Sequence, residues 1–195
     1  MNKPNFRVFS STLCFNGMFF NCSSLKNITI PDSVTDIGHN VFNGCESLES
    51  VTLPKDITYI SYGLFYSCYS LTNITIPDGV TTIMDKAFAG CNLSAGIIIP
   101  SSVTSIGERA FECCAFSTEI IIPDSVTTIG DYAFSDCVYL QSIRIPSSVT
   151  NIGEYAFNNC DSITIFCEVS SKPDDWDENW NSDKRPVVWN CKQEP

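Results

Sequence analysis

Apolar and polar positions follow one pattern that returns every 23 residues along this chain. The unit reads L-x-x-I-x-I-P-x-x-V-T-x-I-G-x-x-A-F-x-x-C-x-x, and Leu140 to Ser162 match it at every position. Its opening, as in Leu25, Ile28 and Ile30, is β-branched and alternates, which predicts a short strand. Proline ends this strand in six consecutive copies because it lacks the N–H that a continuing ladder needs.

The rest of each unit predicts a second extended segment and a turn. Val34 and Ile37 lie three residues apart, which indicates a second short strand on another side of the coil. The glycine that follows in several copies, as at Gly130, is expected to permit a turn that most side chains resist. The stretch from Gly130 to Cys137 carries apolar residues at helical offsets and predicts one irregular or helical turn.

Prolines, cysteines, phenylalanines and threonines all keep the same phase. No unit can bury its apolar residues alone, but stacked units place each residue against its equivalents above and below. The sequence therefore predicts a mainly-β or α/β solenoid, with parallel strands about 4.8 Å apart. The cysteine column consists of Cys22, Cys45, Cys68, Cys91, Cys114, Cys137 and Cys160.

This cysteine column is expected to be an interior stripe of free thiols. Cysteine is among the most often buried residues and packs as a small hydrophobe. Equivalent side chains in stacked coils point the same way, and zinc usually needs pairs such as C-x-x-C, which the chain lacks, so disulfides and metal remain the weaker alternatives. Outside the column, a disulfide between Cys167 and Cys191 stays open; Cys14 and Cys113 complete the set.

Charge and composition exclude some partners. Eleven Lys and Arg against 22 Asp and Glu give a net charge of -11, which disfavours nucleic acid and anionic lipid surfaces. No apolar run approaches the length of a membrane helix, so membrane insertion is not expected. The residues after Met1 lack the apolar run of a secretion signal. Either the chain stays inside the cell, or an export signal has been removed.

The repeat also resembles a known family. The motif I-x-I-P-D-S-V-T-x-I-G-x-x-A-F-x-x-C, seen at Ile120 to Cys137, strongly resembles the BspA-like leucine-rich repeat of bacterial surface proteins. The match covers about Cys14 to Glu168. The resemblance implies a leucine-rich-repeat solenoid of 23-residue coils with its parallel sheet on the concave side. It further implies a cell-surface or secreted adhesin that engages host matrix or cell-surface proteins.

One domain is expected, made of two parts. The solenoid spans 1–168, with an irregular N-terminal coil at 1–24, and a capping segment spans 169–195, with the period ending after Phe166. Terminal coils expose an apolar cross-section that must be covered. An aromatic site for a sugar or peptide is the alternative interpretation of this tail, whose large apolar residues are Trp176, Trp180, Val187, Val188 and Trp189.

Outward strand positions supply the candidate binding site, which is expected on the concave face. The site consists of Ile98 and Ile121, edged by Glu119, Gln141 and Arg144, because an apolar centre with a polar rim is typical of protein interfaces. Singly exposed isoleucines that need no explanation are the alternative. One outward column is predicted as Thr29, Thr52, Thr75, Ile98, Ile121, Arg144 and Cys167, and its neighbour as Asn27, Ser50, Asn73, Gly96, Glu119, Ser142 and Ile165.

Two further surface features are weighed against simple structural roles. An acidic stripe, with Lys86 and Arg109 beside it, is interpreted as a solvated edge; it consists of Asp85, Glu108, Asp131 and Glu154. A tyrosine group is suited to recognition, but partial core packing is the favoured explanation; it consists of Tyr59, Tyr62, Tyr66 and Tyr69.

Catalytic chemistry finds little support in the sequence. The single histidine, His39, is expected in an exposed loop, and no phosphate-binding loop, nucleophile elbow or histidine metal motif occurs. We therefore predict a non-enzymatic protein-binding module without catalytic residues, metal or cofactor. An intracellular scaffold, favoured by the missing signal, is the first alternative. A carbohydrate-binding module, supported by the tail tryptophans alone, is the weaker one. The partner and the oligomeric state stay open.

Overall fold

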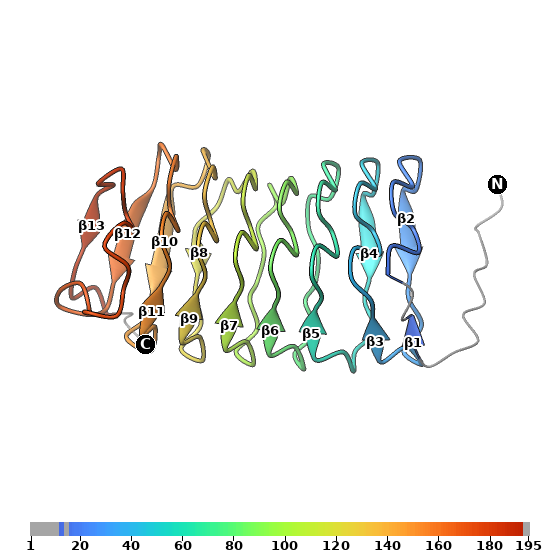
Figure 1. Cartoon of the computed structure of the whole chain (residues 1–195), viewed down its shortest axis with the longest axis horizontal. Coiled ribbons are helices and arrows are strands. Elements are labelled where there is room, and N and C mark those ends of the chain that lie inside the picture. The colour runs from blue at the N-terminus through green and yellow to red at the C-terminus, as the bar shows by residue number, and fades with distance from the viewer. Residues whose placement is uncertain (1–11, 14–15, 193–195) are drawn as a thin grey trace.

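The computed structural model describes residues 12–13 and 16–192. Its coils stack in sequence order along one axis (Figure 1). All strand pairs are parallel, which confirms the predicted parallel-sheet solenoid. The part of the chain that the structure describes has no helix, so the helical alternative for Gly130 to Cys137 is wrong. Counted from the column cysteines, coils 1 to 7 begin at residues 22, 45, 68, 91, 114, 137 and 160.

The first strands of coils 1, 2, 5, 6 and 7 build one side of the solenoid, and β13 of the C-terminal segment extends it. These strands form two separate sheets, ordered β2-β4 and β13-β12-β10-β8. Coils 3 and 4 contribute no strand to this side, and Figure 1 shows plain chain between β4 and β8. The strands are β2 (Asn27–Thr29), β4 (Ser50–Thr52), β8 (Ile120–Ile121), β10 (Ser142–Ile145), β12 (Thr164–Cys167) and β13 (Val187–Val188).

The second strands line another side of the coils and confirm the extended segment predicted around Ile37. They form sheets ordered β1-β3 and β11-β9-β7-β6-β5. The exposed threonine column beside them also bonds between coils: Thr104 Oγ1 donates to the Thr81 carbonyl over 3.2 Å. The strands are β1 (Thr12–Leu13), β3 (Asp36–Ile37), β5 (Tyr59–Ile60), β6 (Thr82–Ile83), β7 (Ser105–Ile106), β9 (Thr128–Ile129) and β11 (Asn151–Ile152).

The third side is a stack of turns between the second strand and the next column cysteine, here called the turn stack. The column phenylalanines from Phe19 to Phe134 donate their backbone N–H to the next turn; the Phe88 amide, for example, lies 2.8 Å from the Ala110 carbonyl oxygen. Adjacent rings are nearly parallel. Their centroid distances range from 5.3 Å, between Phe111 and Phe134, to 5.8 Å, between Phe134 and Phe157. This stack runs without interruption from Phe19 to Phe157.

The column cysteines are more than small hydrophobes. Cys68 Sγ donates over 3.2 Å to the Phe42 carbonyl, which belongs to the preceding turn of the turn stack. The Cys45 amide donates to the same oxygen over 3.0 Å. Because a carbonyl oxygen has two lone pairs, it accepts both hydrogen bonds, and the buried thiol and the buried amide are each paired. The expected interior stripe is confirmed for six members but is wrong for Cys22, which is exposed; the buried members are Cys45, Cys68, Cys91, Cys114, Cys137 and Cys160.

The glycine column has a role other than the expected one. Gly107, Gly130 and Gly153 do not have left-handed backbone angles. Instead, a β-carbon on Gly130 would lie 2.7 Å from the Glu108 backbone nitrogen, so these glycines permit close approach of neighbouring coils. Most left-handed positions lie inside the turn stack, as at Arg109 with φ of 55°, whereas Leu93 and Gly96 lie on the first-strand side.

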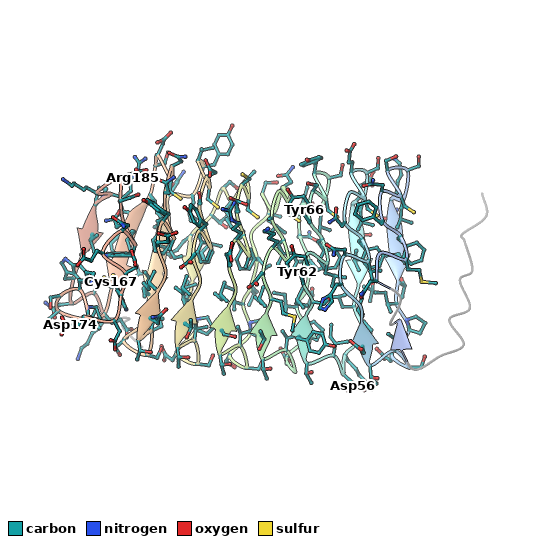
Figure 2. The ribbon with its side chains drawn as sticks, viewed as in Figure 1. Asp56, Tyr62, Tyr66, Cys167, Asp174 and Arg185 are labelled. Atoms are coloured by element: carbon teal, nitrogen blue, oxygen red, sulfur yellow. The ribbon has the colours of Figure 1, made fainter. Side chains whose placement is uncertain are left out.

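The chain after coil 7 folds over the end of the stack. The Trp180 ring meets the Phe157 ring edge-on with centroids 5.9 Å apart, and Trp176 Nε1 donates to the Val149 carbonyl over 3.1 Å. Arg185, labelled at the C-terminal end in Figure 2, pairs with Asp161 over 2.9 Å and with Asp183 over 3.0 Å. These contacts cover the apolar cross-section of the last coils.

Candidate functional site

The outward side chains of the first strands form one row across the coils, here called the outer row. Sheet register places Ile121 beside Arg144, Arg144 beside Phe166, and Phe166 beside Val188. At the other end, Thr29 pairs with Thr52. The row thus changes from polar threonines to a largely apolar segment toward the C-terminal end.

The two candidate isoleucines are exposed. Ile98 is 85% exposed and Ile121 is 49% exposed, high values for large apolar side chains. Glu119 lies beside them, and its carboxylate forms an ion pair with Arg144 Nε over 2.9 Å. The Arg144 guanidinium also lies over the Phe166 ring, 5.1 Å from its centroid. Four of the five predicted site residues are therefore joined by pairing or by a shared surface.

Gln141 lies apart from this group. Its side chain is exposed. It is not part of the walls of a surface depression that Ile98, Ile121 and Glu119 line together.

The predicted outward columns fail at coil 7. Ile165 and Cys167 are buried, and Phe166 and Thr164 take the outward positions. The reason is a missing residue: Ile163 and Ile165 are two apart, where Leu140 and Ile143 are three apart. The period therefore slips before Ile165 and not after Phe166. This spacing is the signal that would have identified Phe166 and Val188 as members of the outer row.

A depression of about 850 Å³ opens where the first-strand side is interrupted. It lies between coils 3, 4 and 5, and its walls are mostly isoleucine, glycine, threonine and proline. Asp78 and Glu119 are the charged residues that line it. The remaining lining residues are Asn73, Ile74, Thr75, Ile76, Ala95, Gly96, Ile97, Ile98, Ile99, Pro100, Thr118, Ile121 and Pro123.

The spacing after the column cysteine changes in coil 4, and equally in coil 5, which nonetheless forms β8. Leu93 is buried two residues after Cys91, whereas Leu71 is buried three residues after Cys68. The segment before Ile97 is consequently one residue longer, and it is taken up by a turn in which the Gly96 amide bonds to the Leu93 carbonyl over 2.9 Å. Gly96 adopts φ of 90°, a left-handed angle that favours glycine.

The acidic stripe is a solvated edge whose carboxylates also bond between coils. Asp85 accepts a hydrogen bond from the Glu108 backbone amide over 2.9 Å, and Asp131 accepts one from the Glu154 amide over 3.0 Å. Arg109 pairs with Glu108 over 3.3 Å, as the basic neighbours were expected to do. The stripe thus has a structural role.

Three of the four grouped tyrosines are exposed, with 38% to 56% of their surface accessible. Tyr62, Tyr66 and Tyr69 are exposed, and Tyr59 is half-buried with its hydroxyl bonded to Asp36. Figure 2 labels Tyr62 and Tyr66, which belong to the same turn. His39, exposed as expected, meets the Tyr62 ring edge-on with centroids 6.1 Å apart.

The thiols are poorly suited to nucleophilic chemistry. Burial raises the pKa of Cys45 to about 11 and that of Cys167 to about 12, so both stay protonated near neutral pH. Cys167 and Cys191 are free thiols, although the Cys191 amide bonds to the Cys167 carbonyl over 3.0 Å. Within residues 12–13 and 16–192, no group of three His, Cys, Asp or Glu side chains is placed to hold a metal ion. Cys14 lies outside the described residues.

The tail tryptophans do not form an open aromatic platform. Trp176 and Trp180 are buried, with ring centroids 4.9 Å apart. Their faces are used against the core and each other, which removes them as the basis for a sugar site. Among the described residues, no helix has the length and apolar character needed to cross a membrane.

Comparison with known proteins gives a consistent family. A model described as the BspA type leucine rich repeat region matches residues 14–116 and 106–173, in six copies. None of the curated proteins matches the chain.

Several solved structures are similar. A leucine-rich repeat protein from Bacteroides ovatus is 32% identical with a TM-score of 0.73, over 83% of this chain and 41% of that one. The leucine rich repeat protein of T. pallidum is 30% identical with a TM-score of 0.67, over 72% of this chain and 68% of that one. A leucine rich cell surface protein from Faecalibacterium prausnitzii is 26% identical with a TM-score of 0.53, over 78% and 57%. The chain thus spans less than half of the Bacteroides protein.

Proposed function

Because the chain belongs to the BspA-type leucine-rich repeat family, we propose that it binds a protein partner through its outer row and does so at a cell surface. Leucine-rich repeat proteins are generally non-enzymatic binding modules, and no enzyme family is indicated for this chain. The surface location is supported by the similar protein from Faecalibacterium prausnitzii, which is named a cell surface protein. The partner class we propose is a host matrix or cell-surface protein.

The observation that carries this proposal is the exposure of Ile98 and Ile121 on a surface where Thr29 and Thr52 hold the equivalent positions. Exposed isoleucine costs solubility and contributes nothing to the core, whereas burial against a partner gains roughly 1.5–3 kcal/mol per side chain. Glu119 and Arg144 are exposed or half-buried beside these isoleucines and supply a polar rim, to which we add the exposed Gln141. We assign these five residues to the contact surface.

The test compares substitutions on one row. Ile98→Asp and Ile121→Asp should each weaken partner binding by about 30-fold or more, the scale of an interface hot spot. Because both side chains point outward, thermal stability should stay unchanged. Binding is measured by surface plasmon resonance against purified extracellular-matrix proteins and against cell-surface proteins.

Thr52→Asp is the matched control, because Thr52 is exposed on the same row in coil 2. It should bind as the parent protein does. Full binding by Ile121→Asp would remove this surface from the proposal.

A further inference from the structure

The interrupted side leaves backbone groups without partners at the depression. In coil 1 the Ile30 amide bonds to the Thr52 carbonyl over 3.0 Å, and in coil 5 the Ile122 amide bonds to the Arg144 carbonyl over 3.0 Å. The equivalent amides of Ile76 and Ile99 make no hydrogen bond within the described part of the chain. Both residues line the depression, although each is more than nine-tenths buried, and their unpaired amides call for a partner there.

The depression suits an extended segment better than a compact ligand. Its walls follow the strand direction of coils 3 to 5, and they combine free amides with isoleucine side chains. A strand-like peptide satisfies both at once, because its main chain supplies carbonyl acceptors and its alternate side chains enter apolar pockets. A small apolar molecule would leave the backbone donors unpaired.

Charge selects the chemistry of such a segment. Among the described residues of the lining, Asp78 and Glu119 are the charged ones, and both are acidic. Glu119 is already paired with Arg144 over 2.9 Å, whereas Asp78 forms no ion pair among the described residues. With a chain charge of -11, a second copy of this protein is repelled and a basic segment is attracted.

We propose that the depression between coils 3, 4 and 5 binds an extended peptide segment of the partner, with apolar residues at alternate positions and a Lys or Arg that pairs with Asp78. This deepens the proposed function, on which it rests, by naming the kind of segment recognised. The main chain of the peptide bonds to the Ile76 and Ile99 amides, and its apolar side chains pack on Ile98 and Ile121.

The probe is a positional-scanning library of acetylated hexapeptides applied to the full chain, followed by fluorescence anisotropy with the selected peptide. Selection should favour Ile or Val at alternate positions and Lys or Arg at one end. Replacing the accepting amide bonds of the peptide by esters weakens their carbonyl acceptors and should weaken binding about tenfold. Asp78→Asn should weaken binding about threefold, and less at high salt.

Asp124→Asn is the matched control, since Asp124 is the exposed equivalent of Asp78 two coils later and lies outside the lining. It should change nothing. Selection of acidic peptides, indifference to ester replacement, or equal effects of the two Asp variants would each overturn the peptide proposal. So would dimerisation that Ile98→Asp abolishes, because a second copy would then occupy the site. If no hexapeptide binds while Ile121→Asp still loses a whole protein partner, this inference fails and the proposed function stands.

Discussion

The turn stack and the first-strand side are built by the same coils, yet only the turn stack is continuous. The rings stack from Phe19 to Phe157, and the phenylalanine amides from Phe19 to Phe134 each bond to the next turn. The first-strand side is divided between β4 and β8, although its residues keep the same 23-residue spacing. The turn stack therefore holds neighbouring coils together even where the first strands do not pair.

This division of roles explains why the first-strand side can carry function. A ladder that the fold does not need can be interrupted, and its residues can be exchanged for isoleucine, arginine or glycine without loss of stacking. The turn stack has no such freedom, because Phe and Cys occupy a dry interior shared with the neighbouring coils. Changes in the turn stack should alter stability, and changes on the outer row should alter binding.

The largest expected effect is alkaline unfolding caused by buried thiols. Unfolded cysteines titrate near pH 8.5, but burial raises the pKa of six core thiols, to about 11 for Cys45, and also raises that of Cys113. As pH rises above about 8.5, the unfolded chain loses protons that the folded chain keeps. The free energy of unfolding then falls by about 1.4 kcal/mol per pH unit for each thiol. The six are Cys45, Cys68, Cys91, Cys114, Cys137 and Cys167.

The stability conferred by neutral thiols is thus complete below about pH 8.5 and is lost progressively through pH 11. Urea midpoints followed by circular dichroism from pH 7 to 11 check this. The double variant Cys91→Ala, Cys137→Ala should reduce the pH slope by about a third, whereas exposed Cys22→Ala should leave it unchanged. A midpoint that stays constant up to pH 10.5 would contradict the role of the buried column.

The next largest effect separates the two sides by mutation. Phe88→Ala removes a buried ring between Phe65 and Phe111 and should lower the free energy of unfolding by about 3–5 kcal/mol. Ile98→Ala in the next coil removes an exposed side chain and should change the free energy of unfolding by less than about 0.5 kcal/mol. Urea unfolding of both variants tests the contrast, and equal losses would refute it.

Periodicity in the sequence predicts the stack, the two short strands and the burial of six column cysteines, because all follow from side chains repeated in phase. It does not predict the thiol bond to the phenylalanine carbonyl. That bond depends on where the backbone of the preceding coil lies, as at Cys114 Sγ and the Phe88 oxygen, 3.1 Å apart. The residue types alone contain no such information.

The candidate site was predictable as far as the register held. Ile98, Ile121 and Glu119 follow from counting outward positions, but Phe166 and Val188 do not, because one residue is missing before Ile165. The depression was missed from the sequence, where the 23-residue period hides a compensated shift at Leu93 that recurs at Phe116 in coil 5. Coil 3 has regular spacing, and nothing in its own sequence explains its missing strand.

The smallest expected effect is local and tests that shift directly. The double variant Leu93→Ser, Ser94→Leu returns the buried leucine to three residues after Cys91 and removes the extra residue before Ile97. Residues 97–99 should then form a strand that pairs with β8, and the Ile99 amide should gain a hydrogen bond worth about 1 kcal/mol. Hydrogen exchange followed by mass spectrometry should show about fivefold slower exchange in the peptide that covers 96–100.

The reverse change in regular coil 6, Tyr139→Leu with Leu140→Ser, should speed exchange across β10. Unchanged exchange in both variants would mean that the position of this leucine does not control strand pairing, and the difference between the two sides of the solenoid would need another cause.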